Sequence, residues 1–239
     1  MTSLENLRLG FGNLFVAFLW VNIPVLLAVM AFTPSGMDMR LLNVAVAATG
    51  GATAIWWNDR TGVSARVATS IAAAALSALF VYALRGTKLQ IDAHMYFFAV
   101  LALLAAWCDW RAIVAYAGFV AVHHLVLNFA FPAAVFPQTR PDIGRVLIHA
   151  VILSVEAAVL IWLNFRLSTA FGAAGPAMAA ARQAHEDALA QASRVREVEQ
   201  QEDLRHVTER NMIAAQIQEK IGAIVQGLLA SAAGISAAT

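Results

Sequence analysis

Four histidines lie in or beside strongly apolar segments of this chain: His94, His123, His124 and His149. Ionisable side chains are expensive inside a membrane-spanning segment, and where they occur they mark a functional site by default. An imidazole nitrogen can ligate a transition-metal ion or a haem iron. The histidines are therefore the first candidates for a binding centre in this chain.

A b-type haem is the cofactor that we expect first. It needs one or two axial histidines and a cavity for its flat ring. We expect His149 and one of His123 and His124 to be ligands, with His94 as a further ligand or partner. Asn128 follows His124 at i+4 on the same helical face, so it joins the predicted cofactor-binding residues.

Haem propionates also need cations close to the membrane surface. Three arginines lie in the connections beside the histidine-bearing segments, at Arg85, Arg140 and Arg145. These positive charges exceed what membrane topology requires, so we expect them to bind the propionates.

A bare metal ion is the alternative at the same residues. Zinc takes three or four ligands in a compact tetrahedron, and the candidates are His94, His123, His124, His149 and Asp92. Copper(I) would accept the same imidazoles together with a soft methionine. A quinone or another small ligand is the third possibility, and composition does not separate the three.

The composition indicates an integral membrane protein. Of the 239 residues, 60% are hydrophobic and 13% are charged, and the mean hydropathy is +0.68. The net charge is +1 with no basic cluster, so nothing points to nucleic acid, and lipids are the expected surroundings. The single cysteine, Cys108, excludes a disulfide within the chain.

Six segments are long and apolar enough to be candidate membrane spans. They lie at about 11–32, 41–57, 65–84, 92–108, 112–131 and 146–165. The connections between them are brief and rich in turn residues, so a ligand must bind inside the bundle or at its rim. We therefore expect an all-α integral membrane protein built as a six-helix transmembrane bundle.

The number of spans sets the depth of the histidines. Six spans put both termini on one side, and we expect the long charged helix after the last span to lie in the cytoplasm. His94 and His149 then lie near the outer ends of their spans, and His123 and His124 lie roughly 12 Å below the outer face. Two adjacent residues of a helix point about 100° apart, so His123 and His124 cannot both face one centre.

The composition changes abruptly after the last span, and we expect a sensor domain at 1–168 and a cytoplasmic helical linker at 169–239. Steps of three and four between apolar residues predict a coiled-coil seam in the linker, with Asn211 as a polar seam position and a phase break near 214–217. The seam positions are 204, 207, 214, 217, 221, 224, 228, 231 and 235.

Three stretches carry a resemblance to a known family. They are "QIDAHMYFFAVLALLAAWCDWR" at 90–111, "HHLVLNFAFPAAVFP" at 123–137 and "GRVLIHAVILSVEAAVLIW" at 144–162. They resemble the six-span sensor region of a group of bacterial methyl-accepting chemotaxis proteins. The tail "IQEKIGAIVQGLLASAAGISAAT" at 217–239 is similar to the start of the chemoreceptor signalling helix.

The resemblance implies a homodimer whose cytoplasmic hairpin controls a histidine kinase through a coupling protein. It covers nearly the whole chain and is strongest across 90–162. The sequence ends before the methylation helices and the hairpin tip of such a receptor, so it corresponds to a sensor and linker fragment. The resemblance supplies no ligand for the sensor region.

Together these features predict a transmembrane sensor module and not an enzyme. A change in the redox or ligand state of the cofactor would shift the fifth and sixth spans, the latter of which continues into the coiled coil. One rival is a zinc-dependent membrane hydrolase with Glu156 or Asp92 as general base, in which the long helix would have no purpose. A transporter is a second rival, but it would need more polar residues in the inner leaflet.

Overall fold

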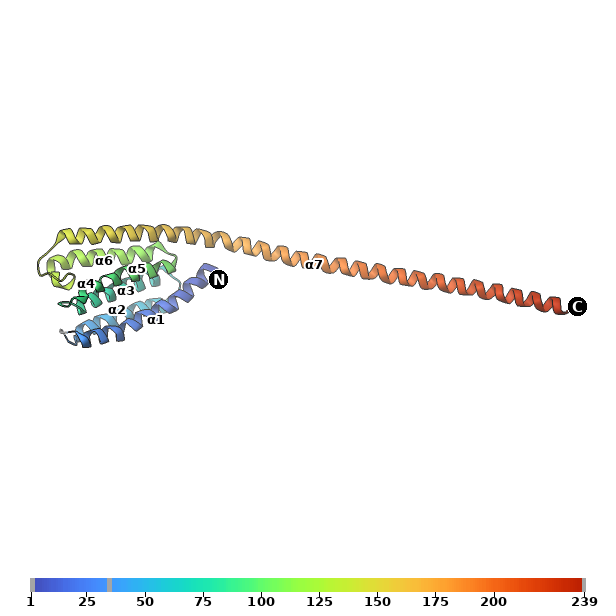
Figure 1. The fold of residues 1–239 in the computed structure, drawn as a ribbon, viewed down its shortest axis with the longest axis horizontal. Coiled ribbons are helices and arrows are strands. Elements are labelled where there is room, and N and C mark those ends of the chain that lie inside the picture. The colour runs from blue at the N-terminus through green and yellow to red at the C-terminus, as the bar shows by residue number, and fades with distance from the viewer. Residues whose placement is uncertain (1–2, 34–35, 238–239) are drawn as a thin grey trace. The chain divides into compact units, whose positions relative to one another are not determined.

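Helices are the only regular secondary structure in the described part of the chain (Figure 1). The computed structural model describes residues 3–33 and 36–237, and for 229–237 it describes the backbone alone. The helices are α1 (Ser3–Phe32), α2 (Met39–Asn58), α3 (Val63–Ala83), α4 (Leu89–Ala93), α5 (Met95–Leu103), the 3₁₀ helix η1 (Leu104–Trp107), α6 (Trp110–Ala130), the 3₁₀ helix η2 (Pro132–Ala134) and α7 (Ile143–Ala237). The prediction of an all-helical fold is confirmed.

Five segments of the described chain are long and apolar enough to cross a membrane. They are α1, α3, the run Leu89–Trp107, α6 and the helix that begins at Ile143. The predicted second span, which corresponds to α2, is not among them. Its sequence "NVAVAATGGATAIWWN" mixes apolar residues with asparagine, threonine and glycine, which lower its hydropathy.

The predicted fourth span is not one continuous helix. It is divided into α4, α5 and η1, and His94 stands between α4 and α5. The amide of His94 donates to the carbonyl of Ile91, three residues back. The carbonyl of Gln90, which an unbroken helix would pair with that amide, instead receives Nδ1 of the His94 ring at 2.8 Å. The side chain has thus replaced a backbone bond.

The last helix continues far beyond the predicted span, as expected. It is one helix from Ile143 to Ala237 and includes Pro176, a residue that lacks an amide hydrogen. The residues up to Pro176 form one compact unit, and those from Ala177 form a second. The predicted domain boundary near 168 stays a prediction, seam positions 231 and 235 have no described side chains, and 1–2 and 238–239 lie outside the described residues.

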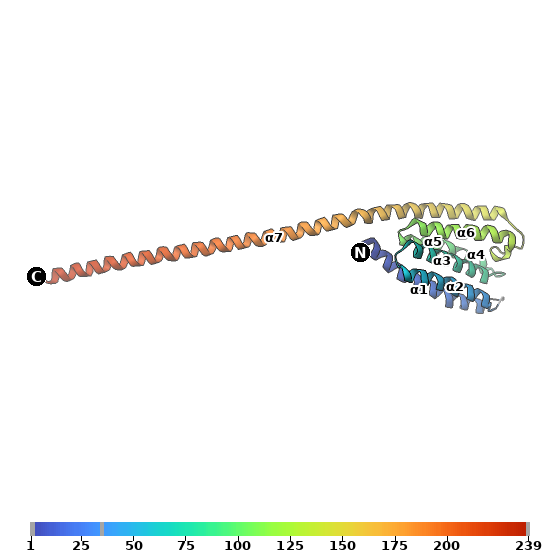
Figure 2. The ribbon, with the colours of Figure 1, turned by 180° about the vertical axis from the view of Figure 1, so that it is seen from behind.

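Helix α3 is the centre of the first unit and packs against α1, α2, α5 and α6 (Figures 1 and 2). Its sequence "SIAAAALSALF" buries a series of alanines, and small side chains let helices approach closely. A second close approach occurs at Gly12 of α1, where a Cβ atom would lie 2.9 Å from the ring atoms of both Trp56 and Trp107. Any larger residue there would displace one of the two indoles.

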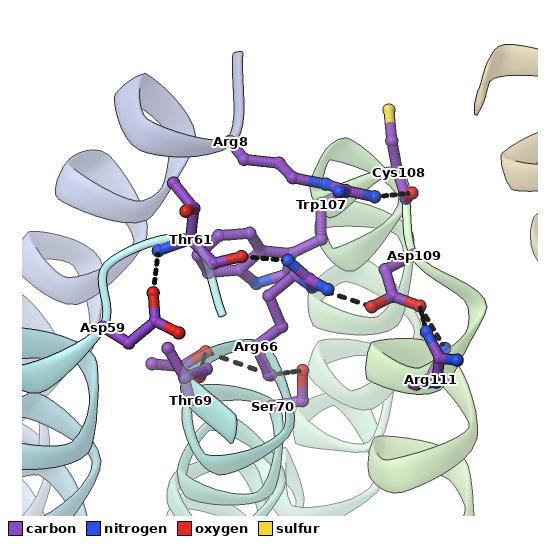
Figure 3. A network of polar contacts seen from close by, with 11 residues as sticks. Arg8, Asp59, Thr61, Arg66, Thr69, Ser70, Trp107, Cys108, Asp109 and Arg111 are labelled. Carbon is purple, nitrogen blue, oxygen red and sulfur yellow. Dashed lines mark hydrogen bonds and ion pairs between the residues drawn. The ribbon is translucent and has the colours of Figure 1, made fainter. Parts of the chain in front are cut away.

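A buried ion pair joins α3 to α6 at the end of the bundle where both helices begin (Figure 3). Nε of Arg66 lies 2.7 Å from Oδ2 of Asp109, and their side chains are 6% and 3% exposed. Asp109 also caps α6, because its Oδ1 accepts from the amide of Arg111 at 3.0 Å. Arg66 donates a further hydrogen bond to the carbonyl of Thr61.

Arg8 brings α1 into the same network (Figure 3). It donates from Nε to the carbonyl of Trp107 at 3.1 Å and from Nη2 to that of Cys108 at 2.7 Å. These carbonyls lie at the end of η1, where they have no helical partner. Cys108 has the left-handed backbone conformation, with φ 48°, and turns the chain between η1 and α6.

Replacing Arg66 with methionine should leave the buried carboxylate of Asp109 with only the half-exposed guanidinium of Arg111, 3.7 Å away, as a charge partner. We expect the R66M variant to lose about 3–5 kcal/mol in free energy of unfolding. Denaturant unfolding of the detergent-solubilised protein measures this loss. The R66M/D109N double variant keeps a capping side chain without the charge, and it should recover much of the stability. A single variant as stable as the wild type would contradict the ion pair.

Burial raises the pKa of the Cys108 thiol above its ordinary value, although the charge of Arg8 opposes the shift. A raised pKa means less thiolate at a given pH, and the thiolate is the nucleophile. Alkylation by iodoacetamide should therefore be slower at pH 8 in the folded protein than in the denatured chain, and its pH profile should lie at higher pH. Mass spectrometry of the labelled peptide gives both rates, and equal rates would contradict the burial.

Candidate functional site

Three of the four histidines meet at one end of the bundle. His94 stands between α4 and α5, His124 lies on α6 and His149 lies on α7. The ring centroids of His94 and His124 are 5.9 Å apart, those of His94 and His149 are 5.7 Å apart, and those of His124 and His149 are 5.8 Å apart. We call this nearly equilateral arrangement the histidine triangle. Residues from three separate segments of the chain form it.

Each ring of the histidine triangle is held by its own helix. Nδ1 lies 2.8 Å from the carbonyl oxygen of Gln90 in His94, 2.9 Å from that of Val120 in His124, and 2.8 Å from that of Arg145 in His149. A carbonyl oxygen only accepts, so Nδ1 carries the proton in all three rings. Nε2 is then the nitrogen with the free lone pair, and it lies on the side of each ring away from that bond.

The Nε2 atom of His94 has no hydrogen-bond partner of good geometry in the described chain, although the backbone of Val135 lies close to the ring. This atom is buried and has no hydrogen-bond partner, and the residue is 7% exposed. His124 is 5% exposed, and its ring is as deeply enclosed. A buried polar atom without a partner costs about 1–3 kcal/mol. Six others occur among the described residues, including Oε1 of Gln90 and Nδ2 of Asn128.

Phe136 covers the histidine triangle. Its ring centroid lies 5.9 Å from that of His94, 6.0 Å from that of His124 and 5.3 Å from that of His149. The loop that carries it folds inward because Nε2 of Gln90 donates to the carbonyl of Ala133 at 3.0 Å. Neither role could be predicted from the sequence, because a phenylalanine and a glutamine beside apolar segments form no distinctive pattern.

Two cavities adjoin the triangle. The first has a volume of about 230 Å³, lies between α5, α6 and α7, and is lined by all three histidines. The second has a volume of about 580 Å³ and is lined by His94, His149, Phe136 and Arg145, among others. The guanidinium carbon of Arg145 lies 5.4 Å from the ring centroid of Phe136. Neither cavity has an aspartate or glutamate among its described lining residues.

The first part of α7 packs loosely against the bundle. Both views place it alongside α6 (Figures 1 and 2), yet its backbone approaches those of the other helices less closely than they approach one another. A third cavity of about 270 Å³ lies between Gly118 of α6 and Ala150 and Ala157 of α7. The interface that carries His149 is therefore incompletely packed.

Asn128 positions the start of α7 and does not face the triangle as a ligand. It is fully buried, and its Oδ1 accepts from the amide of Asp142 at 2.9 Å. Asp142 in turn accepts from the amide of Arg145 at 3.0 Å, as an N-cap does. Asn128 thus links α6 to the first turn of the helix that carries His149.

The other two predicted ligands are not part of the triangle, although Nδ1 of His123 lies 3.5 Å from Nδ1 of His124. His123 lies beside His124, with ring centroids 5.3 Å apart, and stacks on Phe119 at 6.3 Å. Within the described chain, no ring contact joins it to His94 or His149. Asp92 is exposed, and no hydrogen bond or ion pair joins it to the residues of the histidine triangle in the described structure.

The three predicted cations are also divided. Arg145 adjoins the cluster through Phe136, and its Nε lies 3.8 Å from the Asp142 carboxylate. Arg85 lies over the ring of Tyr82 at 4.1 Å. Arg140 is exposed. Of the three, only Arg145 contacts the phenylalanine that covers the histidine triangle in the described structure.

The triangle is slightly wider than a completed metal site. Three imidazoles bound through nitrogen to one ion at about 2.1 Å would have ring centroids about 5–5.5 Å apart. As they stand, no three or more His, Cys, Asp or Glu side chains of the described residues are placed so that they could hold a metal ion. Closure from the observed 5.7–5.9 Å requires each ring to move inward by a few tenths of an ångström.

Comparison of the chain with protein-family models, with curated proteins and with solved structures finds no match.

Replacing Asn128 with alanine should loosen the start of α7. The N128A variant leaves the amide of Asp142 without its buried acceptor, which costs about 1–3 kcal/mol locally. Hydrogen exchange followed by mass spectrometry should then report faster exchange in peptides that contain residues 142–146. V126A on the exposed face of the same helix is the control and should exchange as the wild type does. Unchanged exchange in N128A would show that this hydrogen bond does not hold the helix.

Proposed function

We propose that this chain is a transmembrane sensor module that holds one copper(I) ion between His94, His124 and His149. The observation that supports it is the set of three Nε2 lone pairs left free when each Nδ1 binds its own helix. Three imidazoles in a triangle are a ligand set that first-row transition metals accept. His123 and Asp92 lie outside this ligand set.

A single ion suits the triangle better than a porphyrin does. Because the sides of the histidine triangle are 5.7–5.9 Å long, each ring centroid lies about 5 Å from the midpoint between the other two centroids. A haem bound axially by any two of the rings would be centred on that midpoint, and the third ring, about 5 Å away in the plane of the macrocycle, would overlap its edge. Haem therefore requires one histidine to leave the cluster, and it stays a prediction for the absorption measurement below.

The charge of the site favours monovalent copper over zinc. The three ligands are neutral, and no carboxylate lines either cavity in the described structure. The nearby charges are those of Arg145 and of Asp142, whose carboxylate lies 3.8 Å from Nε of Arg145. The cost of burying an ion in an apolar medium rises with the square of its charge, so a divalent ion would be about four times as costly to bury as a monovalent one. Zinc is the second candidate and would need an anion as its fourth ligand.

Binding would be coupled to movement of α7. His149 is the contribution of α7 to the triangle, and the interface of α7 with α6 contains cavities. Closing the triangle around an ion would draw the start of α7 towards α5 and α6. Interface shifts of about 1–2 Å are the usual size of such switching movements.

The family resemblance supplies the readout of this movement. In a chemoreceptor of that kind the last span continues into a dimeric cytoplasmic coiled coil, which regulates a histidine kinase through a coupling protein. We propose the same arrangement here, with six spans in a bacterial inner membrane and a homodimer through the seam that begins at Leu204. The long helix α7 supports a sensor over a membrane hydrolase, because hydrolysis does not require it.

Copper titration tests the proposal. The purified protein should bind one copper(I) per chain in competition with a chromophoric chelator. The variants H94A, H124A and H149A should each lose more affinity than the about 10- to 100-fold that loss of an outer-shell partner costs. H123A is the matched control, since it removes an adjacent imidazole outside the triangle, and it should bind as the wild type does.

Two results would overturn this assignment. One is copper binding that survives in all three triangle variants. The other is an absorption band of haem in protein expressed with haem precursor, shifting on reduction with dithionite, which would restore haem as the cofactor.

A further inference from the structure

The histidine triangle has two faces, and they differ in what they adjoin. Phe136 lies over one face at 5.3–6.0 Å from the three rings. The cavity of about 230 Å³ is lined by all three histidines but not by Phe136, so it adjoins the other face. An ion bound by three imidazoles has a vacant coordination position along the axis of the triangle, and that position lies on the cavity side.

The cavity accepts only an apolar occupant. Apart from the histidines, every described residue that lines it is alanine, valine, leucine, isoleucine or phenylalanine. Water or an anion at the fourth position would have no hydrogen-bond partner there beyond the metal, and an anion would also lose its hydration. Apolar cavities of about 150 Å³ are known to stay dry and to bind apolar guests, and this one is of that order.

The cavity also borders the outer surface of the bundle. Three of its lining residues, Leu125, Ile143 and Leu147, are 48%, 49% and 58% exposed. In a membrane these side chains face the hydrocarbon, in which small uncharged gases dissolve more readily than ions do. A ligand could therefore reach the triangle from the lipid without crossing a polar surface.

We propose that the fourth ligand of the ion is a neutral diatomic gas, of the class of carbon monoxide and nitric oxide, held in this cavity. The inference rests on the copper(I) site proposed above. The gas donates one lone pair to the ion and accepts electron density from it, so one bond forms, none breaks and no external oxidant or reductant is consumed. Occupation of the cavity between α5, α6 and α7 is then the signal that moves α7.

Infrared spectroscopy with carbon monoxide as the probe tests the inference. The copper(I)-loaded protein, kept free of oxygen, should give one band for copper-bound carbon monoxide at one molecule per copper. The A121W variant fills the cavity from α6, and the milder A150L fills it from α7. Both should keep their copper, and A121W should bind carbon monoxide roughly tenfold more weakly. V126W, on the exposed face of α6, is the control and should bind as the wild type does.

The outcomes separate this inference from the proposed function. Wild-type protein that binds no copper overturns both. Protein that holds copper but gives no carbon monoxide band overturns this inference alone, and so does a wild-type carbon monoxide affinity in both A121W and A150L with their copper retained. Azide serves as the anionic probe, and azide binding to the copper as tight as that of carbon monoxide would also overturn the inference.

Discussion

The hydrogen bond from each imidazole to a carbonyl of its own helix is the constraint on which the site depends. A histidine ring without it could rotate and carry its proton on either nitrogen, and three such rings would rarely turn the same atom towards one point. With Nδ1 fixed at 2.8–2.9 Å from Gln90, Val120 or Arg145, the rotation and the protonation are both set. In the proposed copper site the rings would therefore be oriented before an ion binds, which would lower the cost of binding.

The two ends of the bundle are built in opposite ways. At one end the charges of Arg66 and Asp109 are buried against each other, and Arg8 donates hydrogen bonds to the carbonyls at the end of η1. At the other end the contact between α7 and the bundle contains the cavity beside the histidines, and His149 reaches across it. A rigid end and an incompletely packed end allow a small inward movement of α7 without repacking the core, because filling a void costs less than displacing close-packed side chains.

Much of the fold followed from the sequence, since apolar runs of spanning length separated by turn residues predict helices and their ends. The break at His94 did not follow, because residues 92–108 contain no proline or glycine to mark it. The bond from the ring to the Gln90 carbonyl does not explain it, since His124 and His149 make the same bond in unbroken helices. The meeting of three histidines followed from their depth. Which of His123 and His124 joins the triangle depends on the rotation of α6 about its axis, which tertiary packing sets. Phe136 lies in a loop, and no local sequence pattern indicates that this loop packs against the histidines.

X-ray absorption at the copper edge tests the central claim most directly, because it reports the atoms around the ion without any substitution. Copper(I)-loaded protein without added gas should give three nitrogen neighbours at about 2.0 Å, together with the outer-shell scattering of imidazole rings. A sulfur neighbour, a two-coordinate ion or the four equal nitrogens of a porphyrin would each contradict a triangle of His94, His124 and His149.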